Sequence, residues 1–132
     1  MDPATPKVAI EKLKGKHILL VEDHHDLAEM LTKLLADHDV RVSDVNSGNK
    51  ALSEIEKERP DLILLDLNLP DMNGLGVVTR VRQNDKTKFL PILVVTASPY
   101  EKQNCLRAGC SDFIQKPFHP SDLLNRIAML VD

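Results

Sequence analysis

The sequence contains few aromatic residues and few cysteines. Aromatic residues make up 3% of its 132 residues, and tryptophan is absent. The core must therefore consist mostly of Leu, Ile, Val and Ala side chains. Two cysteines, Cys105 and Cys110, are too few for a disulfide framework or for a four-ligand zinc site. We expect both to be reduced thiols that pack as small apolar residues.

An excess of positive charge and a long apolar run are also absent. Lys and Arg number 17 and Asp and Glu number 20, which gives a formal net charge of −3. This balance argues against direct nucleic-acid binding, which requires a net basic surface. No apolar run approaches the length of a bilayer span, and MDPATPKVAIEKLKGK at the N-terminus lacks the apolar segment of a secretory signal. We therefore expect no membrane association and a cytoplasmic location.

Short apolar runs alternate with longer segments of helical spacing. Residues 18–21, 62–65 and 92–95 are apolar at every position, which is typical of strands buried on both faces of a parallel sheet. Two lesser strands are predicted at residues 40–42 and 113–114. The length is that of one ordinary domain.

The predicted helices are recognised by apolar residues that recur every three or four positions. The four apolar stripes consist of Leu27, Met30, Leu31, Leu34 and Leu35; Ala51, Leu52 and Ile55; Val77, Val78 and Val81; and Leu123, Leu124, Ile127, Leu130 and Val131. A further helix is predicted to begin with a capping box, in which Ser98 is the N-cap, Pro99 is at N1 and Glu101 is at N3. Gly109 is predicted to end this helix.

Five repeats of strand and helix predict an α/β fold, with a five-stranded parallel sheet and helices on both of its faces. The predicted domain covers residues 16–132. Residues 1–15 lie outside the alternating pattern and are expected to form a polar lead-in.

Polar residues directly follow the buried runs. Glu22 and Asp23 follow the first strand, Asp66 follows the third, Thr96 follows the fourth and Lys116 follows the last. Because the carboxyl ends of parallel strands meet at one edge of a sheet, these side chains are expected to converge there.

Three carboxylates at one edge repel one another. Two carboxylates ~4 Å apart repel by about 4 kcal/mol at an effective dielectric constant of ~20. A divalent cation with oxygen ligands, such as Mg²⁺, resolves this conflict. Asp66 can then attack a phosphoryl group as a nucleophile, while Lys116 and Thr96 bind the phosphoryl oxygens.

Four segments carry a resemblance to a known family. LLVEDHHD, LILLDLNLPDMNG, ILVVTAS and DFIQKPF resemble the signature segments of the response-regulator receiver family, the CheY-like domains of two-component signalling. The resemblance extends from about Lys16 to the C-terminus. It implies a flavodoxin-like, doubly wound sheet with the strand order 2-1-3-4-5.

The resemblance also implies roles for single residues. Asp66 resembles the phospho-accepting aspartate. Glu22 and Asp23 match the acidic pair that binds Mg²⁺ or Mn²⁺, with Asp23 as the more direct ligand, and the backbone carbonyl of Asn68 completes the metal ligands. Asn68 and Ser98 occupy the positions that tune the lifetime of the phosphoryl group.

The remaining matches concern the conformational switch. Thr96 matches the switch hydroxyl, and Lys116 matches the lysine of the family pattern, which precedes a cis bond to Pro117. Phe113 stands where the family keeps its switch aromatic, often Tyr, which swings inward when Thr96 moves toward the phosphoryl group.

The function implied is that of a phospho-accepting receiver domain of a response regulator or hybrid kinase. Asp66 would take its phosphoryl group from the phosphohistidine of a histidine kinase or of a phosphotransfer protein. Such a domain catalyses its own phosphorylation and dephosphorylation, but it is a switch more than an enzyme. The resemblance does not identify the downstream effector, and it is compatible with a homodimer.

Three other functions fit parts of the sequence. An aspartyl phosphohydrolase of the haloacid-dehalogenase type needs a second Asp where Asn68 stands. The phosphate loop of a flavodoxin is rich in hydroxyl groups, whereas Glu22 and Asp23 would repel the phosphate of FMN. A docking receiver that acts without phosphorylation is the main alternative, although every expected site residue is present.

His24 and His25 follow the acidic pair, which suggests the hypothesis that both bind a zinc ion. Adjacent residues of a helix point about 100° apart, so both rings do not easily bind one ion. We expect them at the rim of the site instead.

Overall fold

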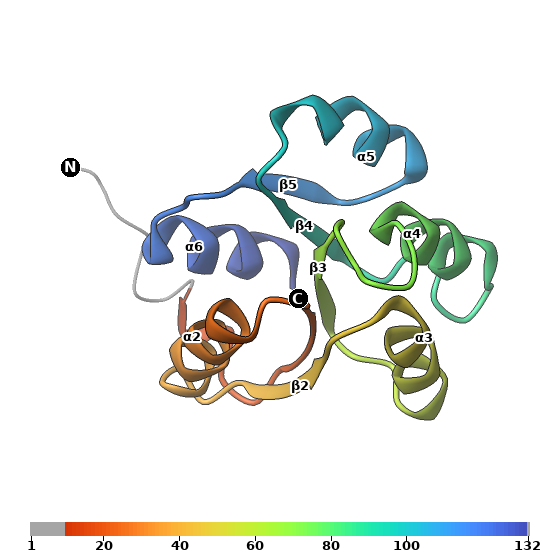
Figure 1. Cartoon of the computed structure of the whole chain (residues 1–132). Coiled ribbons are helices and arrows are strands. Elements are labelled where there is room, and N and C mark those ends of the chain that lie inside the picture. The colour runs from red at the N-terminus through yellow and green to blue at the C-terminus, as the bar shows by residue number, and fades with distance from the viewer. Residues whose placement is uncertain (1–9, 132) are drawn as a thin grey trace.

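The structure of the protein is a computed structural model, and it describes residues 10–131. Its elements are β1 (His17–Val21), α2 (His25–Ala36), β2 (Arg41–Val45), α3 (Gly48–Lys57), β3 (Leu62–Asp66), α4 (Gly74–Gln83), β4 (Ile92–Thr96), η1 (Pro99–Glu101), α5 (Lys102–Ala108), β5 (Asp112–Gln115) and α6 (Pro120–Leu130). The strands form one parallel sheet in the order β2-β1-β3-β4-β5 (Figure 1). This confirms the predicted flavodoxin-like fold.

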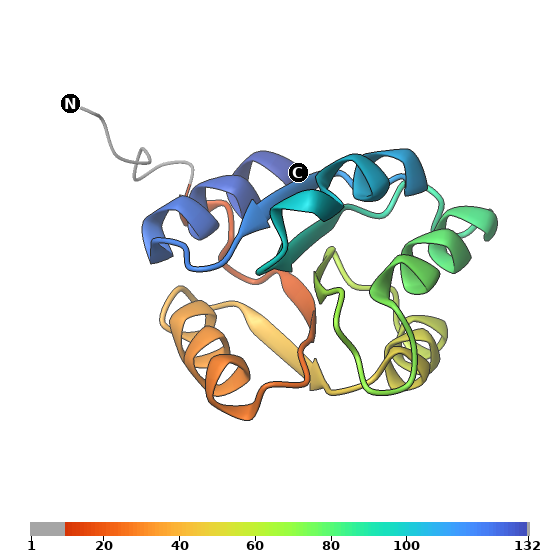
Figure 2. The same cartoon turned by 45° about the horizontal axis from the view of Figure 1, so that its top comes forward.

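Two apolar layers cover the sheet because successive side chains of a strand face opposite sides. On β1, Ile18 and Leu20 belong to the core under α2 and α6, whereas Leu19 and Val21 belong to the core under α3, α4 and α5. Figures 1 and 2 show α2 and α6 on one side of the sheet and α3 and α4 on the other. Every residue of β1, β3 and β4 is buried, which explains the continuous apolar runs.

The packed part of the chain begins before Lys16, where the sequence predicts the domain to start. Leu13 is fully buried and belongs to the core under α2 and α6, and the half-buried Ile10 packs against it. The backbone N–H of Gly15 donates to the carbonyl of Asp39 at 2.9 Å. Two apolar side chains of residues 10–15 therefore contribute to this core. Residues 1–9 lie outside the described residues.

The start of the helical segment before β5 agrees with the prediction in part. Ser98 is the N-cap and Pro99 is in the first turn of the 3₁₀ helix η1, which runs directly into α5. The predicted capping box is wrong, because Ser98 makes no side-chain capping bond. The N–H of Ser98 donates to the hydroxyl of Thr96 at 3.3 Å, which keeps Ser98 in the loop that leaves β4. The helix does end at Gly109, whose φ of 107° is a left-handed conformation that favours glycine.

The two cysteines are free and buried, as predicted. No helix within residues 10–131 is long and apolar enough to cross a membrane.

Candidate functional site

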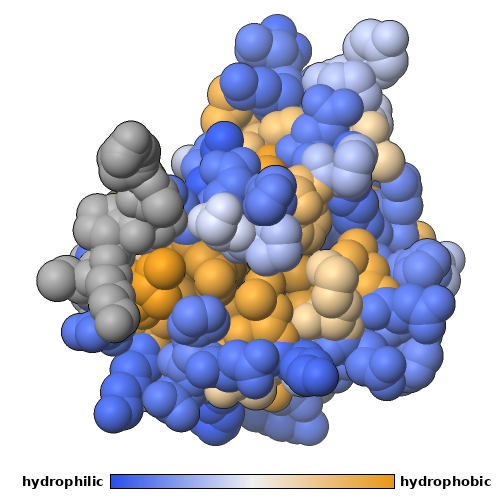
Figure 3. All heavy atoms as spheres, turned by 90° about the vertical axis from the view of Figure 1, so that its left-hand side faces the viewer, coloured by the Kyte–Doolittle hydropathy of each residue, from blue (hydrophilic) through white to orange (hydrophobic). Residues whose placement is uncertain are grey.

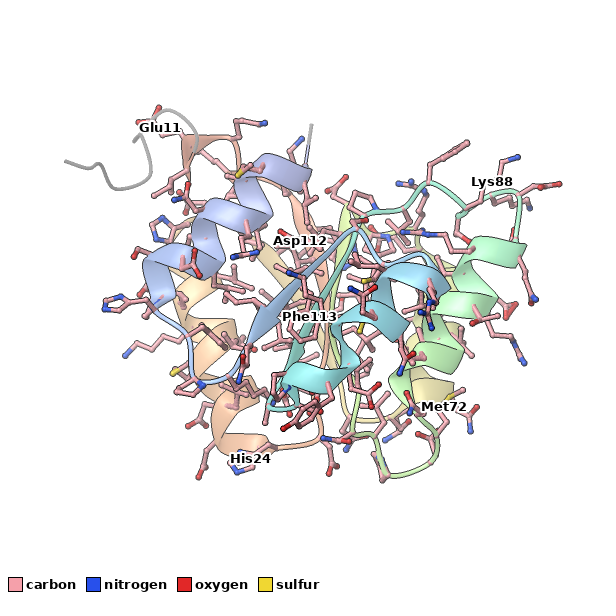
Figure 4. The ribbon with its side chains drawn as sticks, turned by 90° about the horizontal axis from the view of Figure 1, so that it is seen from above. Glu11, His24, Met72, Lys88, Asp112 and Phe113 are labelled. Atoms are coloured by element: carbon pink, nitrogen blue, oxygen red, sulfur yellow. The ribbon has the colours of Figure 1, made fainter. Side chains whose placement is uncertain are left out.

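A hollow of about 400 Å³ opens at the carboxyl ends of β1 and β3. Its lining residues are Glu22, Asp23, His24, Leu27, Asp66, Asn68 and Lys116. They come from the end of β1, the first turn of α2, the end of β3 and the loop after β5. Figure 4 shows His24 and Met72 at this end of the molecule and Lys88 at the opposite end.

The ammonium group of Lys116 connects two buried carboxylates. Its Nζ donates to Oε1 of Glu22 at 3.2 Å and to Oδ2 of Asp66 at 3.4 Å. The Glu22 and Asp66 side chains are 2% and 8% exposed. Buried charges need a partner of opposite sign. Lys116 supplies that partner for both acids at once.

One ammonium group does not fully offset two carboxylates. Burial raises the pKa of Glu22, and the neighbouring Asp66 raises it as well. The N–H of His24, which donates to Oε2 of Glu22 at 3.0 Å, and the charge of Lys116 lower the pKa, but the net shift is upward. The site therefore favours additional positive charge.

The backbone fixes the orientation of Asp66. The N–H of Asn68 donates to Oδ1 of Asp66 at 3.2 Å, while Oδ2 accepts from Lys116. Asp23 and Asn68 are exposed, so they form the solvent side of the hollow. Asp66 thus faces a space that a small ligand can enter.

The donor set fits a hard divalent cation. Glu22, Asp23 and Asp66 offer carboxylate oxygens to the same hollow. Within residues 10–131, no three Asp, Glu, His or Cys side chains enclose a metal by themselves. A cation here would keep several waters beside the carboxylate ligands, which is the coordination that Mg²⁺ favours.

Thr96 and Ser98 lie near the hollow but do not line it. Thr96 ends β4 and is 1% exposed, and its hydroxyl accepts the N–H of Ser98. Its carbonyl accepts the N–H of Lys116 at 2.8 Å. The end of β4 is therefore joined to the residue that pairs with Asp66.

Phe113 is turned into the molecule (Figure 4). It is 8% exposed and belongs to the core under α3, α4 and α5. It also borders a second hollow of about 540 Å³, together with Pro99, Lys102, Ile114, Gln115, Pro117, Phe118, His119, Asp122 and Arg126. The ring thus links the sheet to a groove between α5 and α6. The Lys116–Pro117 peptide bond is cis, as the resemblance implied.

Comparison with known proteins decides the family. Residues 18–128 match the response regulator receiver domain family. The chain belongs to this family. It is 38% identical over 114 residues to the DNA-binding response regulator MtrA of Mycobacterium tuberculosis, covering 85% of this chain and 49% of MtrA. The chain spans about half the length of the curated relatives it matches.

Solved receiver structures have the same fold. The chemotaxis response regulator CheY4 of Vibrio cholerae matches with a TM-score of 0.82 and 33% identity, over 88% of this chain and 98% of CheY4. The receiver domain of the sensor histidine kinase PA1611 of Pseudomonas aeruginosa matches with a TM-score of 0.80 and 33% identity, over 87% of this chain and 95% of that domain. The PA1611 structure contains a magnesium ion coordinated in the active-site cleft. The protein is thus a receiver domain, which is a signalling switch.

The two histidines of this receiver domain face different hollows. His24 lines the hollow at Asp66, and its Nδ1 accepts the N–H of Leu27 at 3.4 Å, which caps α2. His25 lines a neighbouring hollow of about 220 Å³ that it shares with Asp44. The two rings therefore do not share one site.

The sequence pattern does not predict the roles of two residues at this edge of the sheet. Leu27 belongs to the predicted apolar stripe of α2, but it also lines the hollow. Asp71, in the loop after β3, accepts the N–H groups of Gly48 and Asn49, each at 2.9 Å. An acid among turn-forming residues gives no signal that its partners lie more than 20 positions away.

Proposed function

We propose that this receiver domain accepts a phosphoryl group on Asp66 from the phosphohistidine of a histidine kinase or phosphotransfer protein, with Mg²⁺ or Mn²⁺ bound. The observation that carries the proposal is the pairing of Lys116 with both Glu22 and Asp66 beside an open hollow. This arrangement combines a nucleophile, an excess of negative charge and the ammonium group of Lys116, which can donate to a phosphoryl oxygen.

In the proposed reaction a carboxylate oxygen of Asp66 attacks phosphorus. The bond between phosphorus and the donor imidazole nitrogen breaks, and the imidazole takes up a proton. Asp66 needs no general base because it attacks as a carboxylate. The N–H of Asn68 holds the carboxylate in position, and Lys116 donates to a phosphoryl oxygen.

The proposed cation ligands are the side chains of Glu22, Asp23 and Asp66 and the backbone carbonyl of Asn68. A divalent cation held there supplies positive charge to the phosphoryl oxygens. The upward shift in the pKa of Glu22, caused by burial and by Asp66, supports a demand for that charge.

The proposed switch consists of Thr96 and Phe113, and Asn68 and Ser98 set the lifetime of the phosphoryl group before self-catalysed hydrolysis. Thr96 is suited to this role because it bonds to Ser98 through its hydroxyl and to Lys116 through its carbonyl. A movement of Thr96 toward the phosphoryl group would change both contacts. Phe113 borders the groove between α5 and α6, where an effector would detect the change.

The surface beside the hollow supports binding of a protein as phosphodonor. Figure 3 shows apolar side chains gathered on the face where α6 lies above α2. Leu27, Leu34 and Phe118 pack against the core under α2 and α6 and are only partly buried. A partner that covers this surface would bring its phosphohistidine to the rim of the hollow. The proposed setting is the cytoplasm, where a kinase obtains its phosphoryl group from ATP.

The proposal is tested by intact-mass measurement after incubation with Mg²⁺ and acetyl phosphate. The wild type and the control variant Asp85→Asn, which changes an exposed aspartate, should each gain one phosphoryl group. Asp66→Asn should gain none. Labelling that persists in Asp66→Asn would contradict the assignment of Asp66 as the phospho-acceptor.

A wild type that binds Mg²⁺ but shows no adduct requires a second measurement, the release of inorganic phosphate from acetyl phosphate. Release above the Asp66→Asn background would indicate rapid hydrolysis of the adduct. No release would favour the alternative, a docking receiver that acts without phosphorylation.

A further inference from the structure

The N-terminus of α3 is capped from two places. Oγ of Ser47 accepts the N–H of Lys50 at 3.2 Å. The carboxylate of Asp71 accepts the N–H of Gly48 through Oδ1 and the N–H of Asn49 through Oδ2, both at 2.9 Å. The first N–H groups of a helix lack partners within it, and a carboxylate is favourable there. Asp71 therefore ties the loop after β3 to a helix that precedes it by more than 20 residues.

Met72 packs at the same point. A Cβ added to Gly48 would collide with Sδ of Met72, so the absence of a side chain at Gly48 lets the loop approach α3. A Cβ at Gly76 would lie 2.9 Å from Cε of Met72. The loop is thus packed between α3 and α4 where Asp71 is bonded.

The loop after β3, which Asp71 connects to α3, contains part of the site. Asn68 lines the hollow and donates its N–H to Asp66. Asn68 forms an isolated antiparallel bridge with Asn73, and the N–H of Gly74 donates to the carbonyl of Leu67 at 2.8 Å. The base of the loop is closed by these contacts, and its far side is held by Asp71. A shift of the loop at Asp71 would therefore displace Asn68 relative to Asp66.

We infer that Asp71 is a positioning residue for the phosphoryl site, which it serves by holding the loop of Asn68 against the N-terminus of α3. This inference rests on the proposed function of Asp66. Asp71 touches neither the hollow nor its carboxylates in the structure. It acts through the backbone of Asn68, whose carbonyl is a proposed cation ligand and whose N–H orients Asp66.

The carboxylate of Asp71 is charged at neutral pH. The N–H groups of Asn49 and Gly48 hold the pKa of Asp71 below its ordinary range. Both bonds are therefore charge-assisted, and such bonds are stronger than bonds between neutral groups. A neutral replacement weakens the tie even where it keeps the shape of the side chain.

The test compares Asp71→Ala and Asp71→Asn with Ser47→Ala in the full chain. Ser47→Ala removes a cap from the same helix without touching the loop, so it controls for loss of helix stability. The readouts are the dissociation constant for Mg²⁺, measured by calorimetry, and the half-life of the phosphoryl group after acetyl phosphate is removed. Circular dichroism checks that each variant is folded.

Asp71→Ala should bind Mg²⁺ roughly tenfold more weakly, the lower end of the loss seen when a residue that orients a ligand is removed. Its phosphoryl half-life should be shorter because the loosened loop admits water. Asp71→Asn keeps one acceptor oxygen and should lie between Asp71→Ala and the wild type. Ser47→Ala should match the wild type in both readouts.

Unchanged Mg²⁺ affinity and half-life in Asp71→Ala would overturn the inference and leave the proposed function intact. Equal losses in Ser47→Ala would also overturn it, since they would trace the effect to the stability of α3 alone. A wild type that shows neither a phosphoryl adduct nor release of inorganic phosphate from acetyl phosphate would remove the half-life readout and contradict the proposed function. In that case the Mg²⁺ affinities of the same variants still decide the role of Asp71.

Discussion

The ammonium group of Lys116 donates to the carboxylate of Asp66 at 3.4 Å although 50 positions separate them in the chain. Asp66 ends β3, and Lys116 follows β5, which lies beyond β4 in the sheet. The long lysine side chain therefore reaches past the end of β4 to the carboxylates. The net charge of the site therefore depends on residues at the ends of three strands, namely Glu22 after β1, Asp66 on β3 and Lys116 after β5.

Lys116→Ala is expected to lower the free energy of unfolding by about 1–3 kcal/mol in the absence of Mg²⁺, because it leaves Glu22 and Asp66 without a cation. Added Mg²⁺ should restore part of this loss. Urea unfolding with and without Mg²⁺ measures both effects. The control is Lys57→Ala, whose exposed pairing with Glu54 at 3.9 Å is worth less than about 1 kcal/mol. A Lys116→Ala protein as stable as the wild type without Mg²⁺ would contradict this account.

Leu13→Ala tests where the packed core begins. Leu13 is fully buried, and truncating a buried leucine to alanine costs about 2–5 kcal/mol. Lys14→Ala, at the exposed neighbouring position, should change the free energy of unfolding by less than about 0.5 kcal/mol. Urea unfolding compares the two variants. Equal stability of both would mean that the core starts at Lys16, as the sequence pattern predicts.

The strand ends that form the site could be predicted because β1, β3 and β4 are buried along their whole length. Each appears in the sequence as an unbroken apolar run, so the polar residue at its end, such as Glu22, Asp66 or Thr96, stands out. β2 and β5 are the edge strands and are partly exposed. Their sequence signal is correspondingly weaker, although the prediction of both strands is confirmed.

The features that the sequence did not reveal depend on contacts between separate segments or with the backbone. Asp71 bonds to backbone N–H groups, and these have no sequence signature. Leu13 is one apolar residue among polar neighbours, and only its place under α2 and α6 makes it part of the core. Ser98 is the N-cap of η1, as its sequence predicts, but it makes no side-chain capping bond, and its own N–H donates to the Thr96 hydroxyl.

The thiols of Cys105 and Cys110 are expected to be unreactive in the folded protein. Burial raises the pKa of both, and it raises that of Cys110 from 9.0 to about 12. The reactive thiolate of Cys110 is therefore about 1,000-fold scarcer than that of an unperturbed thiol near pH 8. Ellman's reagent should label neither thiol in the native state and both in urea. Rapid labelling of the native protein would contradict the observed burial.

The contribution of Asp71 to stability should depend on pH. Its pKa is lower in the folded protein than its ordinary value of 3.8, because the N–H groups of Asn49 and Gly48 stabilise the carboxylate. A group of this kind contributes stability above the unfolded pKa and loses it as the pH falls through the folded pKa. The difference in free energy of unfolding between the wild type and Asp71→Ala should therefore be complete at neutral pH and shrink below about pH 4.

Urea unfolding at a series of pH values measures this change, with Asp71→Asn as the control. Neither alanine nor asparagine titrates, so the difference between Asp71→Asn and Asp71→Ala should stay constant while the difference from the wild type shrinks. A difference between the wild type and Asp71→Ala that does not change with pH would show that the charge of Asp71 does not stabilise α3. The tie between this helix and the loop of Asn68 would then depend on the packing of Met72 against Gly48.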